Sequence, residues 1–159
     1  MHPVPPLPAY ERDPRLTRLE TEVVEAGEAE GRPFVVLADT VLYPEGGGQP
    51  PDHGTVGGVA VVDVQKAGGA IRHFLAGPPP SGRVTAELDW ARRFDHMQQH
   101  TAQHLLTAVA DACFGWHTTA FHLGERVSDI ELDTPGIGAS RLVELEEAVA
   151  AEIRAARPV

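Results

Sequence analysis

The sequence has little cysteine and no long apolar run. Cys113 is the only cysteine among 159 residues, which excludes an internal disulfide framework and is typical of a protein of the reducing cytosol. No apolar run approaches the ~20 residues of a membrane-spanning helix, and the first residues lack the pattern of a secretory signal peptide. We therefore expect a cytoplasmic protein that does not engage a membrane.

Positive charge is also scarce. The chain has 13 lysine and arginine residues against 23 aspartate and glutamate residues, a formal net charge of −10. This balance argues against a nonspecific nucleic-acid binder, but it leaves room for a local basic patch. The candidates for such a patch are Lys66, Arg83, Arg92 and Arg93. The hydrophobic share of 42% is ordinary, and the length suits one medium domain or two small ones.

The stretch from Asp95 to Gly115 predicts a helix with both ends marked. Asp95 is a candidate N-cap and Gly115 a candidate C′ residue. Apolar residues form a packing stripe between them, namely Leu105, Leu106, Val109, Ala112 and Cys113. We expect Cys113 to be a small buried core residue of this stripe.

Three histidines follow one another at four-residue intervals on this helix: His96, His100 and His104. Residues at i and i+4 share a helix face, so two adjacent rings can hold one metal ion. The alternative is a solvated polar face that is rich in histidine, and the spacing alone does not decide. No glutamate directly follows His96 or His100, which excludes the helix of a zincin protease.

Three consecutive glycines, Gly46, Gly47 and Gly48, allow positive φ angles and the close approach of a ligand. The lysine and hydroxyl spacing of a phosphate loop is absent. Two interpretations remain open. One is a hairpin or barrel-corner turn, and the other is a substrate loop in which Gln49 donates and accepts hydrogen bonds. Beside the glycines, Glu45 and Asp52 are expected to cap the turn in preference to serving as general bases.

The rest of the chain favours an α+β fold. Short strands separated by glycine and proline turns are predicted at residues 21–25, 33–38, 57–64, 70–75 and 84–90. Together they favour a small β-barrel over about residues 15–90, after an extended N-terminal arm over residues 1–14. An α/β domain is predicted over residues 91–159, with extended segments at 118–123 and 128–133 and a helix from 140 to about 155.

Two motifs resemble one known family. Leu42-Tyr-Pro-Glu-Gly-Gly-Gly-Gln-Pro-Pro-Asp-His-Gly54 resembles the Gly-rich motif of the AlaX-type alanyl-tRNA editing proteins, which the editing half of alanyl-tRNA synthetase shares. His96-Met-Gln-Gln-His-Thr-Ala-Gln-His-Leu-Leu106 is similar to that family's zinc helix, and segments 121–125 and 130–133 resemble the strands that follow it. The resemblance runs from about Leu16 to Val159, and the two motifs occur in the family's order.

The resemblance implies a β-barrel joined to an α/β editing domain. It also implies hydrolysis, in trans, of the ester between serine or glycine and the tRNA for alanine, which serves translational quality control. The family's zinc ligands carry over to His100 and His104, whereas His96 is not at a ligand position. The family's other two ligands lie in a Cys/His segment beyond the second helix. Since the chain ends at Val159 before that segment, we expect the editing domain and its zinc site to be incomplete, with His117 and His122 as weaker candidates for a further ligand.

The same resemblance suggests roles for polar residues near the motifs. Gln49 and Thr101 are expected in the catalytic set, and Gly46, Gly47, Gly48 and Thr118 in substrate binding. For each side chain the alternative is an ordinary solvent or backbone hydrogen bond. The zinc ion could polarise the ester or activate water, or it could bind serine and act in selection. The competing hypothesis is a catalytically incomplete fragment, or a metal-binding or tRNA-binding module of the same fold.

Overall fold

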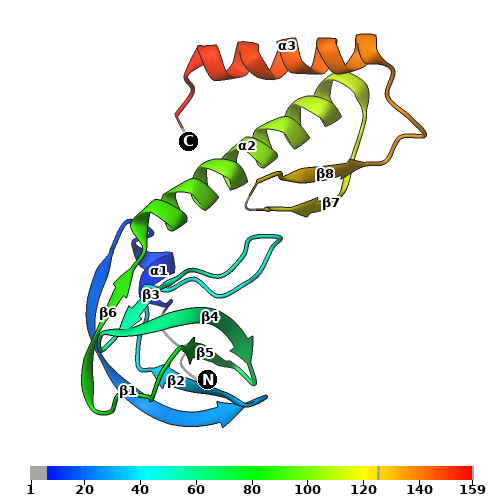
Figure 1. Ribbon diagram of the computed structural model, residues 1–159. Helices are drawn as coiled ribbons and strands as arrows, with labels where there is room; N and C mark the ends of the chain where they lie inside the picture. The colour runs from blue at the N-terminus through cyan, green and yellow to red at the C-terminus, as the bar shows by residue number, and fades with distance from the viewer. Residues whose placement is uncertain (1–6, 125, 159) are drawn as a thin grey trace, which may run out of the picture. The chain divides into compact units, whose positions relative to one another are not determined.

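The computed structural model describes residues 7–124 and 126–158 (Figure 1). The chain divides into two compact units, one ending at Asp95 and the other beginning at His96. Within the described residues, no helix is both long enough and apolar enough to cross a membrane.

The first unit is a closed antiparallel barrel with the strand order β1-β2-β5-β4-β3-β6. The strands are β1 (Arg18–Ala29), β2 (Arg32–Leu37), β3 (Gly54–Val56), β4 (Val59–Ala67), β5 (Ala70–Leu75) and β6 (Arg83–Leu88). The prediction of an α+β fold with an N-terminal barrel is confirmed. The strand predicted at 57–64 is present as β4 but begins at Val59, because Gly57 and Gly58 take φ angles of +57° and +82° and turn the chain into it from β3, which is not predicted.

The barrel core follows the alternation of side chains along each strand. On β2, Val35 and Leu37 belong to the main core cluster, whereas Phe34 and Val36 join Phe74 of β5 in a separate cluster. Gly54, the last residue of the Gly-rich motif, lies where two strands approach closely. A Cβ atom there would lie 2.0 Å from the carbonyl oxygen of Glu87, so only glycine fits at this position.

The N-terminal arm contains a helix that the sequence analysis does not predict. Residues 1–6 of the expected extended arm lie outside the described part of the chain, and α1 (Ala9–Arg12) follows them. The carboxylate of Asp39 accepts a hydrogen bond from the Ala9 N–H at 2.8 Å, which satisfies one of the helix's first donors. A four-residue helix has too few residues to show an apolar period, so it escapes pattern analysis.

The central helix α2 (Trp90–Phe114) begins earlier than predicted. The prediction of Asp95 as N-cap is wrong, because the carboxylate of Asp89 accepts the backbone N–H of Arg92 at 3.2 Å. The strand predicted to reach residue 90 accordingly ends at Leu88. The other end is confirmed: Gly115 has φ +67°, and its N–H donates to the Asp111 carbonyl at 2.8 Å.

The second unit combines the histidine-bearing part of α2 with a two-stranded antiparallel sheet and a further helix. The strands are β7 (Thr118–His122) and β8 (Asp129–Leu132), and the helix is α3 (Ala139–Ala155). The three elements match the predicted segments at 118–123, 128–133 and 140–155. Glu125, which closes one of the segments resembling the editing family, lies outside the described residues.

The core of this unit is small and includes only some residues of the predicted apolar stripe. Its buried members are Val109, Ala110 and Leu145, with Leu105 and Phe114 packed against them. The prediction that Cys113 is buried is wrong, since the thiol side chain is exposed. Ala112 is exposed as well. Because α2 contributes Leu105, Val109, Ala110 and Phe114 to the packed cluster, Ala112 and Cys113 are left outside it.

Candidate functional site

The glycine stretch forms the tip of a hairpin. The backbones of Gly46 and Gln49 exchange hydrogen bonds of 3.2 and 3.1 Å across the turn. Gly47 and Gly48 between them take φ angles of +60° and +78°, which is the two-residue turn that favours glycine at both central positions. The hairpin interpretation of the glycines is therefore confirmed as their local structure. At Gly47 no other atom lies within 4 Å of where a Cβ would stand, so the tip is open.

The base of this hairpin is fastened by Asp52. Its carboxylate accepts the Tyr43 N–H at 2.7 Å, and its own N–H donates to the Tyr43 carbonyl at 3.0 Å. The Tyr43 hydroxyl donates to the Gly46 carbonyl at 3.1 Å, and the Glu45 N–H donates to the Val64 carbonyl at 2.9 Å. Asp52 is fully buried and caps this turn, as expected, so it does not present a carboxylate to a substrate.

Arg93 neutralises this buried carboxylate. Its Nε lies 3.2 and 3.0 Å from the two Asp52 oxygens, and its Nη2 also donates to Asp52. The remaining donors bind the carbonyls of Val41 at 2.8 Å and Pro14 at 2.9 Å. Arg93 is 3% exposed, so its place in a surface basic patch is ruled out. Its guanidinium instead joins the two arms of the Gly-rich hairpin to the start of α2.

A second buried polar network, centred on His73, holds the start of the Gly-rich motif. The His73 Nδ1 lies 3.2 Å from the Val35 carbonyl, and its Nε2 lies 2.8 Å from the Thr40 hydroxyl. Because a carbonyl can only accept, Nδ1 carries the proton and Nε2 accepts from Thr40. The Thr40 oxygen accepts the Leu42 N–H at 3.0 Å. Burial lowers the pKa of His73 to about 4, so the ring is neutral at physiological pH.

The sequence analysis overlooks both residues of this network. His73 alternates with the apolar residues Ile71 and Leu75 along β5, and Thr40 lies two residues before the Gly-rich motif. A histidine among apolar residues of a strand is the signal that points to a buried partner. Gln49, which the sequence does single out, is also buried, with 6% of its surface exposed.

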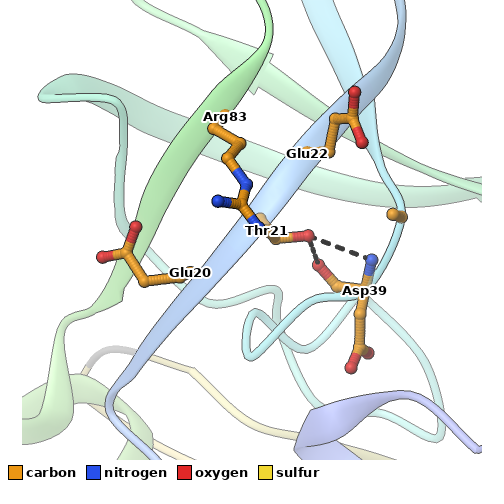
Figure 2. Close-up of a pocket in the computed structure, with 6 residues that line it drawn as sticks. Glu20, Thr21, Glu22, Asp39 and Arg83 are labelled. Carbon is orange, nitrogen blue, oxygen red and sulfur yellow. Dashed lines mark hydrogen bonds between the residues drawn. The ribbon is translucent and has the colours of Figure 1, made fainter.

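A hollow on the side of the barrel, of about 390 Å³, is lined by charged residues (Figure 2). It is formed by Glu20, Thr21, Glu22, Ala38, Asp39 and Arg83. The Thr21 hydroxyl donates to the Asp39 carbonyl at 2.9 Å and accepts the Asp39 N–H at 3.2 Å, as Figure 2 shows. The lining holds three carboxylates, of which that of Asp39 is paired with Arg12, and one guanidinium, so the hollow has a negative charge. Arg83 is therefore poorly placed to attract a phosphate.

Two of the three histidines on α2 have closely stacked rings. The rings of His100 and His104 have centroids 4.9 Å apart and planes inclined by 17°. The His100 ring also lies against Phe121 of β7, with centroids 6.2 Å apart. Burial and the neighbouring His104 ring both lower the pKa of His100. A neutral imidazole at physiological pH is the form that can bind a metal ion. His96 is buried, with 8% of its surface exposed, whereas His100 is half-buried and His104 is exposed.

The chemistry of these rings fits part of a zinc site. Among residues 7–124 and 126–158, no three His, Cys, Asp or Glu side chains gather closely enough to hold a metal ion. His117 instead lies 2.8 Å from Asp111, and His122 lies 3.0 Å from Asp129. The described residues thus supply two donors, half of the four that a structural zinc site takes.

Thr101 and Thr118, the threonines expected in the site, lie in different surroundings. Thr101 is exposed on α2, one residue after His100. The Thr118 hydroxyl lies 2.7 Å from that of Thr107, which accepts a hydrogen bond of 2.9 Å from Gln103. Within the first unit, the glycines and Gln49 belong to one hairpin. Within the second, His100 and His104 form one stack and Thr118 joins a polar chain.

No protein-family model matches the chain. The chain is 52% identical over 126 residues to the alanyl-tRNA editing protein Aarsd1 of Danio rerio, across 79% of this chain and 31% of that protein. It is 44% identical over 162 residues to Aarsd1-B of Xenopus laevis, across 94% of this chain and 39% of that protein. It is 36% identical over 132 residues to the alanyl-tRNA editing protein AlaX-L of Pyrococcus horikoshii, across 78% and 33%. The chain spans between 31% and 39% of these relatives' lengths.

Proposed function

Because the chain belongs to the AlaX-type family of alanyl-tRNA editing proteins, we propose that it acts in hydrolysis of the ester that joins serine or glycine to the tRNA for alanine. The reaction adds water across this ester and releases the free amino acid and the tRNA 3′ hydroxyl. One observation carries the proposal: the sequence contains both a Gly-rich hairpin and a stacked pair of histidines, in the family's order along the chain. The proposed compartment is the cytoplasm, which the single cysteine suits.

The chain's own residues can contribute binding and orientation. The open tip formed by Gly47 and Gly48 lets an aminoacylated 3′ end approach the backbone of the hairpin, and Gly46 closes that turn. Gln49 is proposed to donate a hydrogen bond to the oxygen on which negative charge develops when water attacks the ester carbonyl. Thr101 is proposed to orient the attacking water. These assignments are supported by the loop geometry and by the chemistry of the amide and hydroxyl groups.

We further propose that His100 and His104 hold a zinc ion at two of its coordination positions, with donors beyond the described residues at the others. The stacked rings and the lowered pKa of His100 support this assignment. When bound, zinc would supply a Lewis acid for the carbonyl or an anchor for the amino acid. The two imidazoles would each contribute a nitrogen ligand, and the lowered pKa of His100 keeps that ring neutral below the usual histidine range.

Selection of serine over alanine needs a group that hydrogen-bonds the extra hydroxyl. Thr118 is proposed for this role. If Thr107 donates its proton to Thr118, the Thr118 proton stays available for a substrate. A site built in this way leaves a polar group unpaired when alanine enters, so correctly charged tRNA is disfavoured.

The test is deacylation of seryl-tRNA prepared on the tRNA for alanine, with and without added zinc. The expected result is zinc-dependent release of serine, with alanyl-tRNA left largely intact. A folded protein that releases serine no faster than buffer, at any zinc concentration, would contradict the proposal for this chain.

A second candidate function is a module that binds metal or tRNA without hydrolysing the ester. This candidate is favoured because His100 and His104 supply only two metal donors among the described residues. The two candidates differ in the same assay: the module would bind the tRNA, or would bind zinc, while leaving the ester intact.

A further inference from the structure

An RNA substrate presents phosphates, whereas this chain carries a net charge of −10. Four of the eight arginines in the barrel unit are already paired with carboxylates. The ion pairs are Arg12 with Asp39, Arg18 with Glu87, Arg32 with Asp63 and Arg93 with Asp52. A paired guanidinium attracts a phosphate weakly, because the neighbouring carboxylate cancels its charge. Any phosphate contact by this unit must therefore come from one of the remaining cations.

Arg92 differs from those arginines in its surroundings. It lies in the first turn of α2, and its Nε donates to the carbonyl of Pro51 at 3.1 Å. Pro51 belongs to the Gly-rich motif, so this bond places the guanidinium beside the hairpin. Asp89 accepts the backbone N–H of Arg92, not its side chain. Within the described ranges, no carboxylate forms an ion pair with the Arg92 guanidinium.

The other candidates for a basic patch do not combine a bond to the Gly-rich hairpin with freedom from nearby carboxylates. Arg93 is buried against Asp52, and Arg83 lies in the acidic hollow of Figure 2. Lys66 is exposed on β4, where its neighbour Gln65 binds the carboxylates of Glu45 and Asp63. Arg93 is also bonded to the Gly-rich motif, but through the buried carboxylate of Asp52. Of the four cations that the sequence suggests, Arg92 alone combines a bond to this motif with a guanidinium that forms no ion pair among the described residues.

We propose that Arg92 binds a phosphate of the RNA backbone at the rim of the Gly-rich hairpin. The inference rests on the proposed function and names a residue that would hold its substrate. The Pro51 carbonyl engages one N–H of the guanidinium, and the Nη groups remain to donate to two phosphate oxygens. Because the Pro51 bond already orients the side chain, less conformational freedom is lost on binding.

The test measures the affinity of the full chain for a labelled, uncharged alanine tRNA transcript across a series of KCl concentrations. Loss of one phosphate contact reduces the slope of log K against log salt by about 0.8 and weakens binding about sixfold at ~0.1 M salt. We expect Arg92→Gln to show both changes and Arg92→Lys, which keeps the charge, to retain the slope. Arg83→Gln is the matched control and should bind as the unmodified chain does.

Two outcomes would overturn the inference while leaving the proposed function intact. One is an Arg92→Gln variant that binds with unchanged affinity and slope. The other is an Arg92→Lys variant that loses as much slope as Arg92→Gln, since this would assign the effect to the lost Pro51 bond. If the unmodified chain binds no tRNA at all, the proposed function fails first and the inference fails with it. A melting temperature for each variant shows that the comparison is between folded proteins.

Discussion

Arg93 and Asp52 form an ion pair that is almost completely withdrawn from water, with side chains 3% and 0% exposed. Removing two charges from water costs several kcal/mol per ion, and this cost is offset only when the hydrogen bonds are complete. Here the carbonyls of Val41 and Pro14 and the N–H of Tyr43 complete them. The pair ties together three segments that are far apart in the sequence, so we interpret it as a device that selects one conformation of the Gly-rich hairpin.

Replacing Arg93 alone should be strongly destabilising, because it leaves the Asp52 carboxylate buried without a counter-charge. We expect Arg93→Met to lower the free energy of unfolding by about 3–5 kcal/mol, measured by urea denaturation. The double variant Arg93→Met with Asp52→Asn should recover part of that loss. Arg83→Met serves as the control. A stability of the Arg93→Met single variant close to that of the unmodified chain would refute this account.

His73 should make stability depend on pH. Its pKa is about 4 in the folded chain, against 6.5 for an unperturbed histidine, so the unfolded chain binds the proton first as pH falls. Stability is therefore complete above about pH 6.5 and decreases toward pH 4, by roughly 3 kcal/mol in total. Urea denaturation across this range should show the decrease in the unmodified chain and a smaller one in His73→Gln. Parallel curves for the two proteins would exclude His73 as the cause.

The glycines of the Gly-rich motif should differ in how much stability is lost when alanine replaces them. Gly47 and Gly48 have positive φ angles, and a Cβ at Gly47 would stand in open space, so alanine at either position should cost about 1–2 kcal/mol. Gly54 has no room, since a Cβ would lie 2.0 Å from the Glu87 carbonyl oxygen. Gly54→Ala should therefore lower the melting temperature more than Gly47→Ala, with Gly136→Ala as a neutral control. The reverse order would contradict the barrel packing.

The histidine pair can be tested by metal binding without any activity assay. Titration calorimetry with zinc should show at least a tenfold loss of affinity in His100→Ala and His104→Ala. His117→Ala should bind as the unmodified chain does, because that ring lies against Asp111. Since the pKa of His100 is lowered, protons should compete with zinc at this ring only below the usual histidine range. Equal zinc affinities in all the variants would contradict the proposal that His100 and His104 bind zinc.

Gln49 should matter to the reaction more than to the fold. An amide that stabilises a developing oxyanion is worth about 10²–10³ in rate, so Gln49→Ala should slow seryl-tRNA deacylation by a factor in this range. Its melting temperature should remain near that of the unmodified chain, and Gln65→Ala should keep the full rate. An undiminished rate in Gln49→Ala would place the residue outside the site.

The elements that could be predicted are those whose signal is local. The strand at residues 70–75 and the helix from about 140 to 155 come from short-range periodicity, and the structure has them at Ala70–Leu75 and Ala139–Ala155. The start of α2 was misplaced because Asp95 and Asp89 are equally good caps in isolation, and only the end of β6 at Leu88 decides between them. The exposure of Cys113 depends on which residues of α3 pack on α2, which is not a local property.

By itself, the sequence determined the α+β class, the glycine turn, the four-residue spacing of the histidines and the family to which the chain belongs. These follow from the backbone freedom of glycine, the helical period and residue identity, which need no knowledge of distant contacts. Only the tertiary structure decided that Arg93 is buried with Asp52, that His73 holds Thr40 and that Arg92 is bonded to Pro51. Each of these pairs joins residues more than thirty positions apart, and long-range contacts form only when the whole barrel closes.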